Sequence, residues 1–263
     1  MLYYITQGGI HMSTMFPKIS ERLETPRVIC SILYSILAFW SLPFILLLLM
    51  QGSFEDMRVL AGVESAYHIA NFAVAAYLFF PYLQDSLINV EINVKGFWTV
   101  VCACAAIAVC VGVFLWFCCM YIPHGVAIMA AESVLPLVEK ELFTTAGNFL
   151  GISPILGTIC MVILTPVSIS CLFYGAVFAP VATKYPKLAY LVVTVFLAIP
   201  SLCNAVTYWD PTIEMATYFV QLPIHLLACW SYQKTDTIWA PIGVHGLSNA
   251  VSCAIWLVLI YLV

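Results

Sequence analysis

The sequence is poor in charge, and what it lacks excludes several classes of protein. Only 8% of its 263 residues are charged, and nine Lys or Arg stand against thirteen Asp or Glu without a basic cluster. Nucleic acid is bound through rows of basic side chains, so it is not an expected partner. Glycine- or serine-rich linkers, low-complexity segments and internal repeats are missing as well. The chain is therefore expected to form one folded unit, not two linked soluble domains or a repeat array.

Cysteine is present, but it lacks the spacing of a disulfide framework or a metal site. The sequence has eleven cysteines and no C-x-x-C pair. Most of them lie inside apolar runs, where they are expected to pack as small apolar residues. Examples are Cys102, Cys104, Cys110, Cys118 and Cys119.

Apolar residues are what the sequence has in excess: 63% of it is hydrophobic, with a mean hydropathy of +1.03. No soluble domain needs so much apolar surface, so we expect an all-α fold, a polytopic transmembrane helical bundle. Residues 1–27, beginning at Met1 or at a later Met such as Met12, are expected to be a cytoplasmic N-terminal segment, and 28–263 the transmembrane domain. The first apolar run is too long for a signal-peptide core. About seven runs approach the ~20 residues that cross a hydrocarbon core: 28–50, 59–82, 97–121, 152–180, 187–207, 213–232 and 238–263.

The basic residues predict the orientation, because cytoplasmic loops carry an excess of Lys and Arg. With the N-terminus inside, only Arg58 and Lys140 fall on the outer side, and the C-terminus lies outside. Between the third and fourth runs, residues 122–150 carry apolar side chains at three- and four-residue intervals, which predicts a helix on the outer surface that Pro136 interrupts. The inner side holds seven basic residues: Lys18, Arg22, Arg27, Lys95, Lys184, Lys187 and Lys234.

Polar residues inside the expected spans are candidate site residues, because in lipid each needs a partner or a watery cavity. Glu64 and His68 lie four residues apart, which predicts either a hydrogen-bonded pair that fixes helix packing or one wall of a polar pocket. His225 is expected to pack or to form a hydrogen bond. His245 and Asn249 are also four apart and share a helix face, so both should meet the same neighbour. This last pair favours a polar pocket.

Some of these residues are also candidate metal ligands. Imidazole and carboxylate groups suit zinc, and the four candidates are Glu64, His68, His225 and His245. They come from three expected helices and show no H-E-x-x-H pattern. The sequence therefore predicts no cofactor, with zinc as a secondary alternative.

The last apolar run opens with a motif that resembles a known family. Residues 232–249 read Y-Q-K-T-D-T-I-W-A-P-I-G-V-H-G-L-S-N. Members of the CAAX-protease and bacteriocin-processing family (CPBP, also called Abi) typically read Y-x-x-T-G-S-[IL]-W-A-P-I-x-x-H-x-x-x-N at this point. The resemblance implies a CAAX-protease-like core at about 152–255. It places His245 and Asn249 at retained catalytic positions.

Two earlier motifs of that family are matched only in part. Where the family has E-E-x-x-F-R-G, residues 169–175 read I-S-C-L-F-Y-G, so Ile169 and Ser170 replace the glutamates and Tyr174 the arginine. Where the family has F-x-x-x-H, Pro200 replaces the histidine. The resemblance implies that active members activate a water with the glutamates and stabilise the reacting oxygen with His and Asn, which suits general-base and oxyanion chemistry. This chain keeps the hydrogen-bond donors, His245 and Asn249, but lacks the glutamates that would act as the base.

The resemblance implies a non-catalytic homologue that acts in peptide binding, bacteriocin immunity or scaffolding. Its expected location is the bacterial cytoplasmic membrane, with lipids and a membrane-associated peptide or protein as partners. The alternative is an active intramembrane endopeptidase of the CAAX or leader-processing type, in which Glu64 supplies the base, or Ser170 or Cys171 is a nucleophile with His245 as base. A small-solute transporter is a third class, against which stands the lack of repeat symmetry.

Overall fold

The structure is a computed structural model that describes residues 25–38, 57–126, 154–208 and 211–262. Within these ranges every regular element is a helix and there is no strand, so the all-α fold class is confirmed. Most of the expected N-terminal segment 1–27 (residues 1–24) and most of the expected surface helix 122–150 (residues 127–150) lie outside the described residues.

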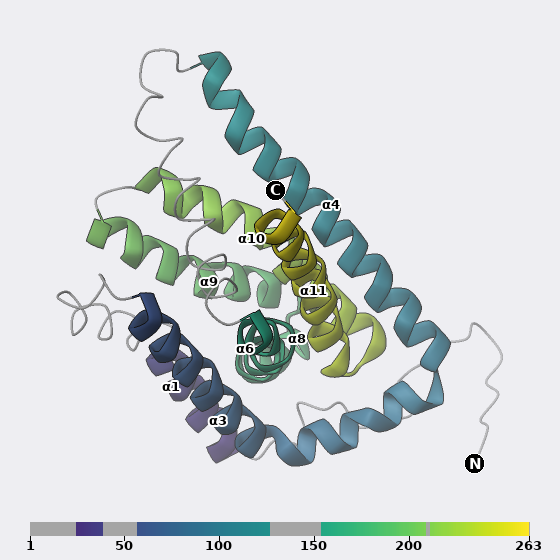
Figure 1. Cartoon of the computed structure of the whole chain (residues 1–263). Helices are drawn as coiled ribbons and strands as arrows, with labels where there is room; N and C mark the ends of the chain where they lie inside the picture. Colours follow the sequence, from purple (N-terminus) through teal and green to yellow (C-terminus); the bar gives the residue numbers. More distant parts are fainter. Residues whose placement is uncertain (1–24, 39–56, 127–153, 209–210, 263) are drawn as a thin grey trace, which may run out of the picture.

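One continuous helix forms the centre of the bundle. It contains two π-helical segments, and we call it the central helix; Figure 1 shows it nearly end-on. All nine residues of its second π-segment are buried. Contacts reach it from α1, α3, α9 and α11, which explains why its whole circumference is apolar. Its parts are α6 (Pro154–Ile159), η3 (Cys160–Leu164), α7 (Thr165–Ile169), η4 (Ser170–Phe178) and α8 (Ala179–Ala182).

In the described part of the chain six further helices are present, and all but α4 pack against the central helix. Of these, α4 packs along α10 and α11 on one side of the bundle and extends past them at one end (Figure 1). The short turn between α10 and α11 makes these two helices neighbours. The six helices are α1 (Thr25–Ile36), α3 (Met57–Ile92), α4 (Val94–Val126), α9 (Pro186–Tyr208), α10 (Pro211–Thr235) and α11 (Trp239–Leu262).

Helix α3 continues well beyond the expected span at 59–82. It contains Pro81, which cannot donate a backbone hydrogen bond and bends the helix. After the bend, α3 runs along one end of the bundle and leads to α4 (Figure 1). This second part of α3 forms hydrogen bonds with the turn between α10 and α11.

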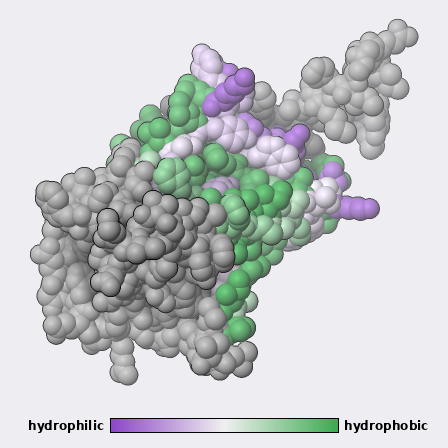
Figure 2. All heavy atoms as spheres, turned by 90° about the horizontal axis from the view of Figure 1, so that it is seen from above, coloured by the Kyte–Doolittle hydropathy of each residue, from purple (hydrophilic) through white to green (hydrophobic). Residues whose placement is uncertain are grey.

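Two helices in the described part of the chain are long and apolar enough to cross a membrane, Val94–Leu115 and Pro154–Ala182. They correspond to the third and fourth expected spans. In the face seen in Figure 2, apolar side chains gather over much of the described part. Large apolar side chains are exposed on α4, such as Trp98, Ile107 and Phe114. The total of seven spans and the orientation of the termini stay predictions.

Candidate functional site

The turn between α10 and α11 is fixed to α3 by polar contacts. The Thr237 hydroxyl donates to the Ser86 carbonyl at 2.9 Å and accepts the Trp239 backbone N–H at 3.3 Å, which caps α11. The Trp239 indole N–H donates to the Leu83 carbonyl at 2.9 Å. These bonds hold the start of α11 in one position relative to the bundle.

Asp236, in the same turn, has a left-handed backbone with φ of 50°. This conformation costs little for glycine and is strained for most other residues. The Asn89 side-chain amide donates to the Asp236 carbonyl, so α3 also holds the strained peptide in place. Glycine is what the CAAX-protease motif has at this position, and the structure gives the reason.

A His–Tyr–His cluster lies in the core, with its histidines about two to three helical turns from that junction. The Tyr174 hydroxyl of η4 lies 2.7 Å from Nδ1 of His225 on α10 and 2.7 Å from Nε2 of His245 on α11. The two imidazole centroids are 5.0 Å apart, and the Tyr174 ring stacks on His245. Tyr174 is fully buried, while His225 is 8% and His245 4% exposed. We call these three residues the Tyr174 cluster.

The hydrogen bonds of the Tyr174 cluster link the tautomers of its two histidines. A phenol has one hydrogen to donate, so Tyr174 donates to one imidazole and accepts an N–H from the other. If it donates to His225, His245 carries its proton on Nε2; if it donates to His245, His225 carries its proton on Nδ1. Either arrangement is satisfied with both rings neutral, as suits a buried position.

Asn249, one turn beyond His245, binds a different part of the central helix. Its side-chain amide donates to the Met161 carbonyl at 2.8 Å. Next to it, a Cβ on Gly246 would lie 3.2 Å from the Val162 carbonyl, so the two backbones approach closely. His245 and Asn249 thus face the same neighbour, the central helix, but at separate π-helical segments. Such segments are frequent at functional sites.

Residues 151–251 match the family model described as Type II CAAX prenyl endopeptidase Rce1-like. This segment is similar to the CAAX-protease family. The resemblance read from the sequence is thereby confirmed. Neither a curated protein nor a solved structure matches the chain. The matched segment contains the central helix, the Tyr174 cluster and Asn249, so the geometry described above is that of the CAAX-protease-like part.

The positions that align with the family glutamates carry no carboxylate. Ser170 is fully buried, and its hydroxyl has no hydrogen-bond partner in the described structure. The described structure therefore has no Ser170–His245 hydrogen bond. Cys171 is buried as well, against the core. Gly175, which the family motif also has, lets the Phe79 ring approach to 2.6 Å from where a Cβ would stand.

His68 forms its hydrogen bond outside the Tyr174 cluster. The His68 ring meets the Thr165 hydroxyl at 3.0 Å. The side chains of Glu64 and Pro200 lie outside the described residues, although both positions are helical. No group of three or more His, Cys, Asp or Glu that could hold a metal occurs in the part of the chain that was described.

His225 is the site residue whose role the sequence reasoning underrated. It was expected to be a packing or hydrogen-bonding residue on its own, yet it lies beside His245. A signal was present, because residues 225 and 245 are nearly equidistant from the turn at Asp236. In two antiparallel helices joined by a short turn, such positions face one another. The partner Tyr174 had no comparable signal.

Proposed function

We propose that the chain is a non-catalytic, CAAX-protease-like membrane protein that holds a membrane-associated peptide or protein without hydrolysing it. The observation that carries this proposal is the Tyr174 hydroxyl, which hydrogen-bonds both His225 and His245 at 2.7 Å. An imidazole acts as a base or donor toward a substrate only through a nitrogen that is within reach of it. Here one nitrogen of each ring is occupied by the same phenol.

The missing carboxylates support the same proposal. General-base catalysis contributes roughly 10²- to 10⁴-fold to a rate, and a serine hydroxyl cannot take a proton from water. Ser170 stands at a glutamate position of the family motif and Tyr174 at its arginine position, and both side chains are fully buried. The tyrosine is compatible with folding, because the Tyr174 hydroxyl satisfies one nitrogen of each of two buried imidazoles.

The test separates binding from cleavage. The purified full chain in detergent is incubated with a prenylated CAAX peptide and, separately, with a leader-bearing peptide, and products are followed by mass spectrometry. We expect saturable binding of at least one peptide and no cleavage of either. His245→Ala should leave the absence of products unchanged.

An active endopeptidase is the competing function, and the unpartnered Ser170 hydroxyl is the observation in its favour. Cleavage of either peptide that His245→Ala abolishes would establish this activity and refute the non-catalytic proposal. Tyr190→Phe is the control for His245→Ala, because it too removes one side-chain hydrogen bond, the one to Gln233, but outside the cluster. An active enzyme should keep its cleavage in this control.

A further inference from the structure

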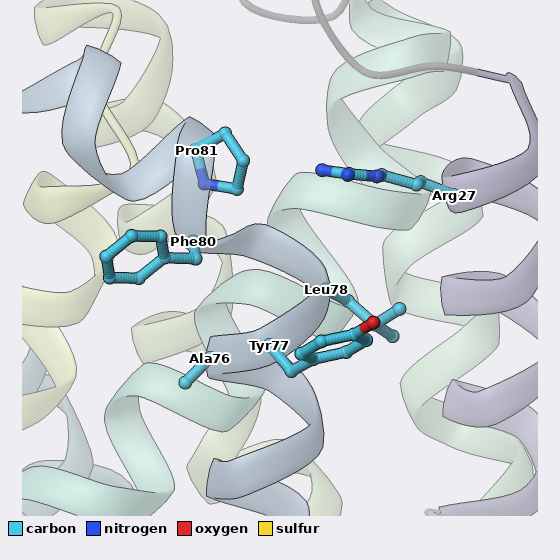
Figure 3. A pocket seen from close by; sticks show the side chains of 6 residues that line it. All are labelled: Arg27, Ala76, Tyr77, Leu78, Phe80 and Pro81. Carbon is cyan, nitrogen blue, oxygen red and sulfur yellow. The ribbon is translucent and has the colours of Figure 1, made fainter.

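A groove between α1 and α3, on the outside of the bundle, combines one cation with an apolar lining. Its volume is about 550 Å³. Figure 3 shows the Arg27 side chain extending from α1 toward Pro81, with the Tyr77 ring and Leu78 beside the gap. Six residues line the groove: Arg27, Ala76, Tyr77, Leu78, Phe80 and Pro81.

The two helices that form the groove run antiparallel. The Tyr34 hydroxyl donates to the Asn71 side-chain oxygen at 2.8 Å, and farther along the Tyr67 hydroxyl donates to the Ala38 carbonyl at 3.0 Å. The N-terminal end of α1, where Arg27 lies, is therefore next to the bend of α3. These contacts fix the position of the cation at one end of the groove.

The surface of α3 changes at its bend. Before Pro81, the exposed side chains that the structure describes are uncharged and mostly apolar or aromatic, as with Ile69 at 48% and Tyr77 at 80% exposed. After Pro81, the helix turns along the end of the bundle and carries the charged, exposed Asp85 and Glu91 beside exposed apolar residues such as Ile92. A helix that leaves the hydrocarbon region should change its surface in this way. The Arg27 end of the groove thus lies at the level of the lipid headgroups.

We propose that this groove binds an anionic phospholipid, with its phosphate on Arg27 and an acyl chain along Tyr77, Leu78 and Phe80. A guanidinium binds phosphate oxygens through two parallel hydrogen bonds. Tyr77 and Phe80 are exposed where aromatic side chains favour the membrane interface. The site is separate from the Tyr174 cluster, so it goes beyond the proposed function and requires only that the chain is embedded in a membrane.

The test is native mass spectrometry of the full chain in mild detergent, where no bulk lipid surface contributes. Phosphatidylglycerol and phosphatidylcholine with identical acyl chains are added in equal amounts, and bound lipid is counted. We expect phosphatidylglycerol to be retained about tenfold better, and Arg27→Gln to remove that preference. Arg27→Lys should keep part of it. Ala76→Trp should displace the lipid by filling the groove without a change in charge.

The matched control is Lys187→Gln, because Lys187 is exposed and lies outside the groove. It should retain phosphatidylglycerol as the unmodified chain does. Glycerol phosphate, which has the headgroup charge without acyl chains, should not compete at equal concentration. The proposal is overturned if the unmodified chain retains both lipids equally, if Lys187→Gln loses as much lipid as Arg27→Gln, or if glycerol phosphate displaces the lipid completely.

Discussion

Within residues 232–249, the turn and His245 differ in where their polar side chains find partners. In the turn, Thr237 and Trp239 donate to backbone carbonyls of α3. In α11, His245 bonds to another side chain, Tyr174, whereas Asn249 of the same helix binds the Met161 carbonyl. A backbone acceptor is available whatever residue stands there, whereas a side-chain partner must be present in the sequence. The turn therefore keeps its hydrogen bonds when the residues of α3 that supply the carbonyls are substituted. His245 keeps its hydrogen bond only while a suitable side chain stands at position 174.

The turn should be the part whose loss costs most stability. Thr237→Val removes the α11 cap and leaves the buried Ser86 carbonyl without its side-chain donor, so the free energy of unfolding should fall by about 2 kcal/mol. The thermal unfolding midpoint in detergent measures this. Thr235→Val is the matched control, because Thr235 bonds only within its own helix, to the Ser231 carbonyl. Equal losses for the two variants would contradict the scaffold role.

Much of the scaffold was predictable from the sequence. The central helix follows from a long apolar run, and the start of α11 follows from Thr237 and Trp239 in the family motif. The helical continuation of α3 beyond Pro81 was not predictable, because it depends on the turn that packs against it. The π-helical segments were not predictable either, since side chains of other helices, such as Asn249, bind carbonyls within them.

The Tyr174 cluster was harder to predict than the scaffold. His245 and Asn249 stood out because they share a helix face, and His225 could have been added from its distance to the turn. From the sequence, Tyr174 was only the residue that replaces the arginine of the family motif. Sequence spacing does not show which residues it contacts on other helices. The structure replaces that reading with a specific partner for both histidines.

A change in the Tyr174 cluster should lower the free energy of unfolding less than a change in the turn, but it should alter the hydrogen bonding of both histidines. Tyr174→Phe keeps the buried ring and removes the hydroxyl, which leaves two imidazole nitrogens unpaired at a cost of about 1–2 kcal/mol. Imidazole nitrogen NMR shifts should report the released rings. Tyr190→Phe, which removes the bond to Gln233 on a less buried side chain, should change neither the shifts nor the midpoint appreciably. Unchanged imidazole shifts in Tyr174→Phe would refute the linked tautomers.

A substitution of Asn249 shows whether this residue stabilises the fold, as the turn does, or affects the histidines of the Tyr174 cluster. Its amide binds the Met161 carbonyl, so Asn249→Ala should lower the free energy of unfolding by about 1 kcal/mol. The imidazole shifts of His225 and His245 should stay as they are. Ser252→Ala is the control, because its hydroxyl bonds only to the Ser248 carbonyl of the same helix. Altered imidazole shifts in Asn249→Ala would instead assign Asn249 to the cluster.

The smallest expected effect is a gain, and it concerns the one described residue other than glycine with positive φ. Asp236→Gly should raise the free energy of unfolding by up to about 1 kcal/mol, because glycine adopts φ of 50° without a Cβ clash. The Asn89 bond is to the backbone carbonyl and survives the change. Asp236→Ala removes the same carboxylate but keeps a Cβ, so it should bring no gain. If both variants were equally stable, the turn would carry no backbone strain, and its rigidity would come from the contacts with α3 alone.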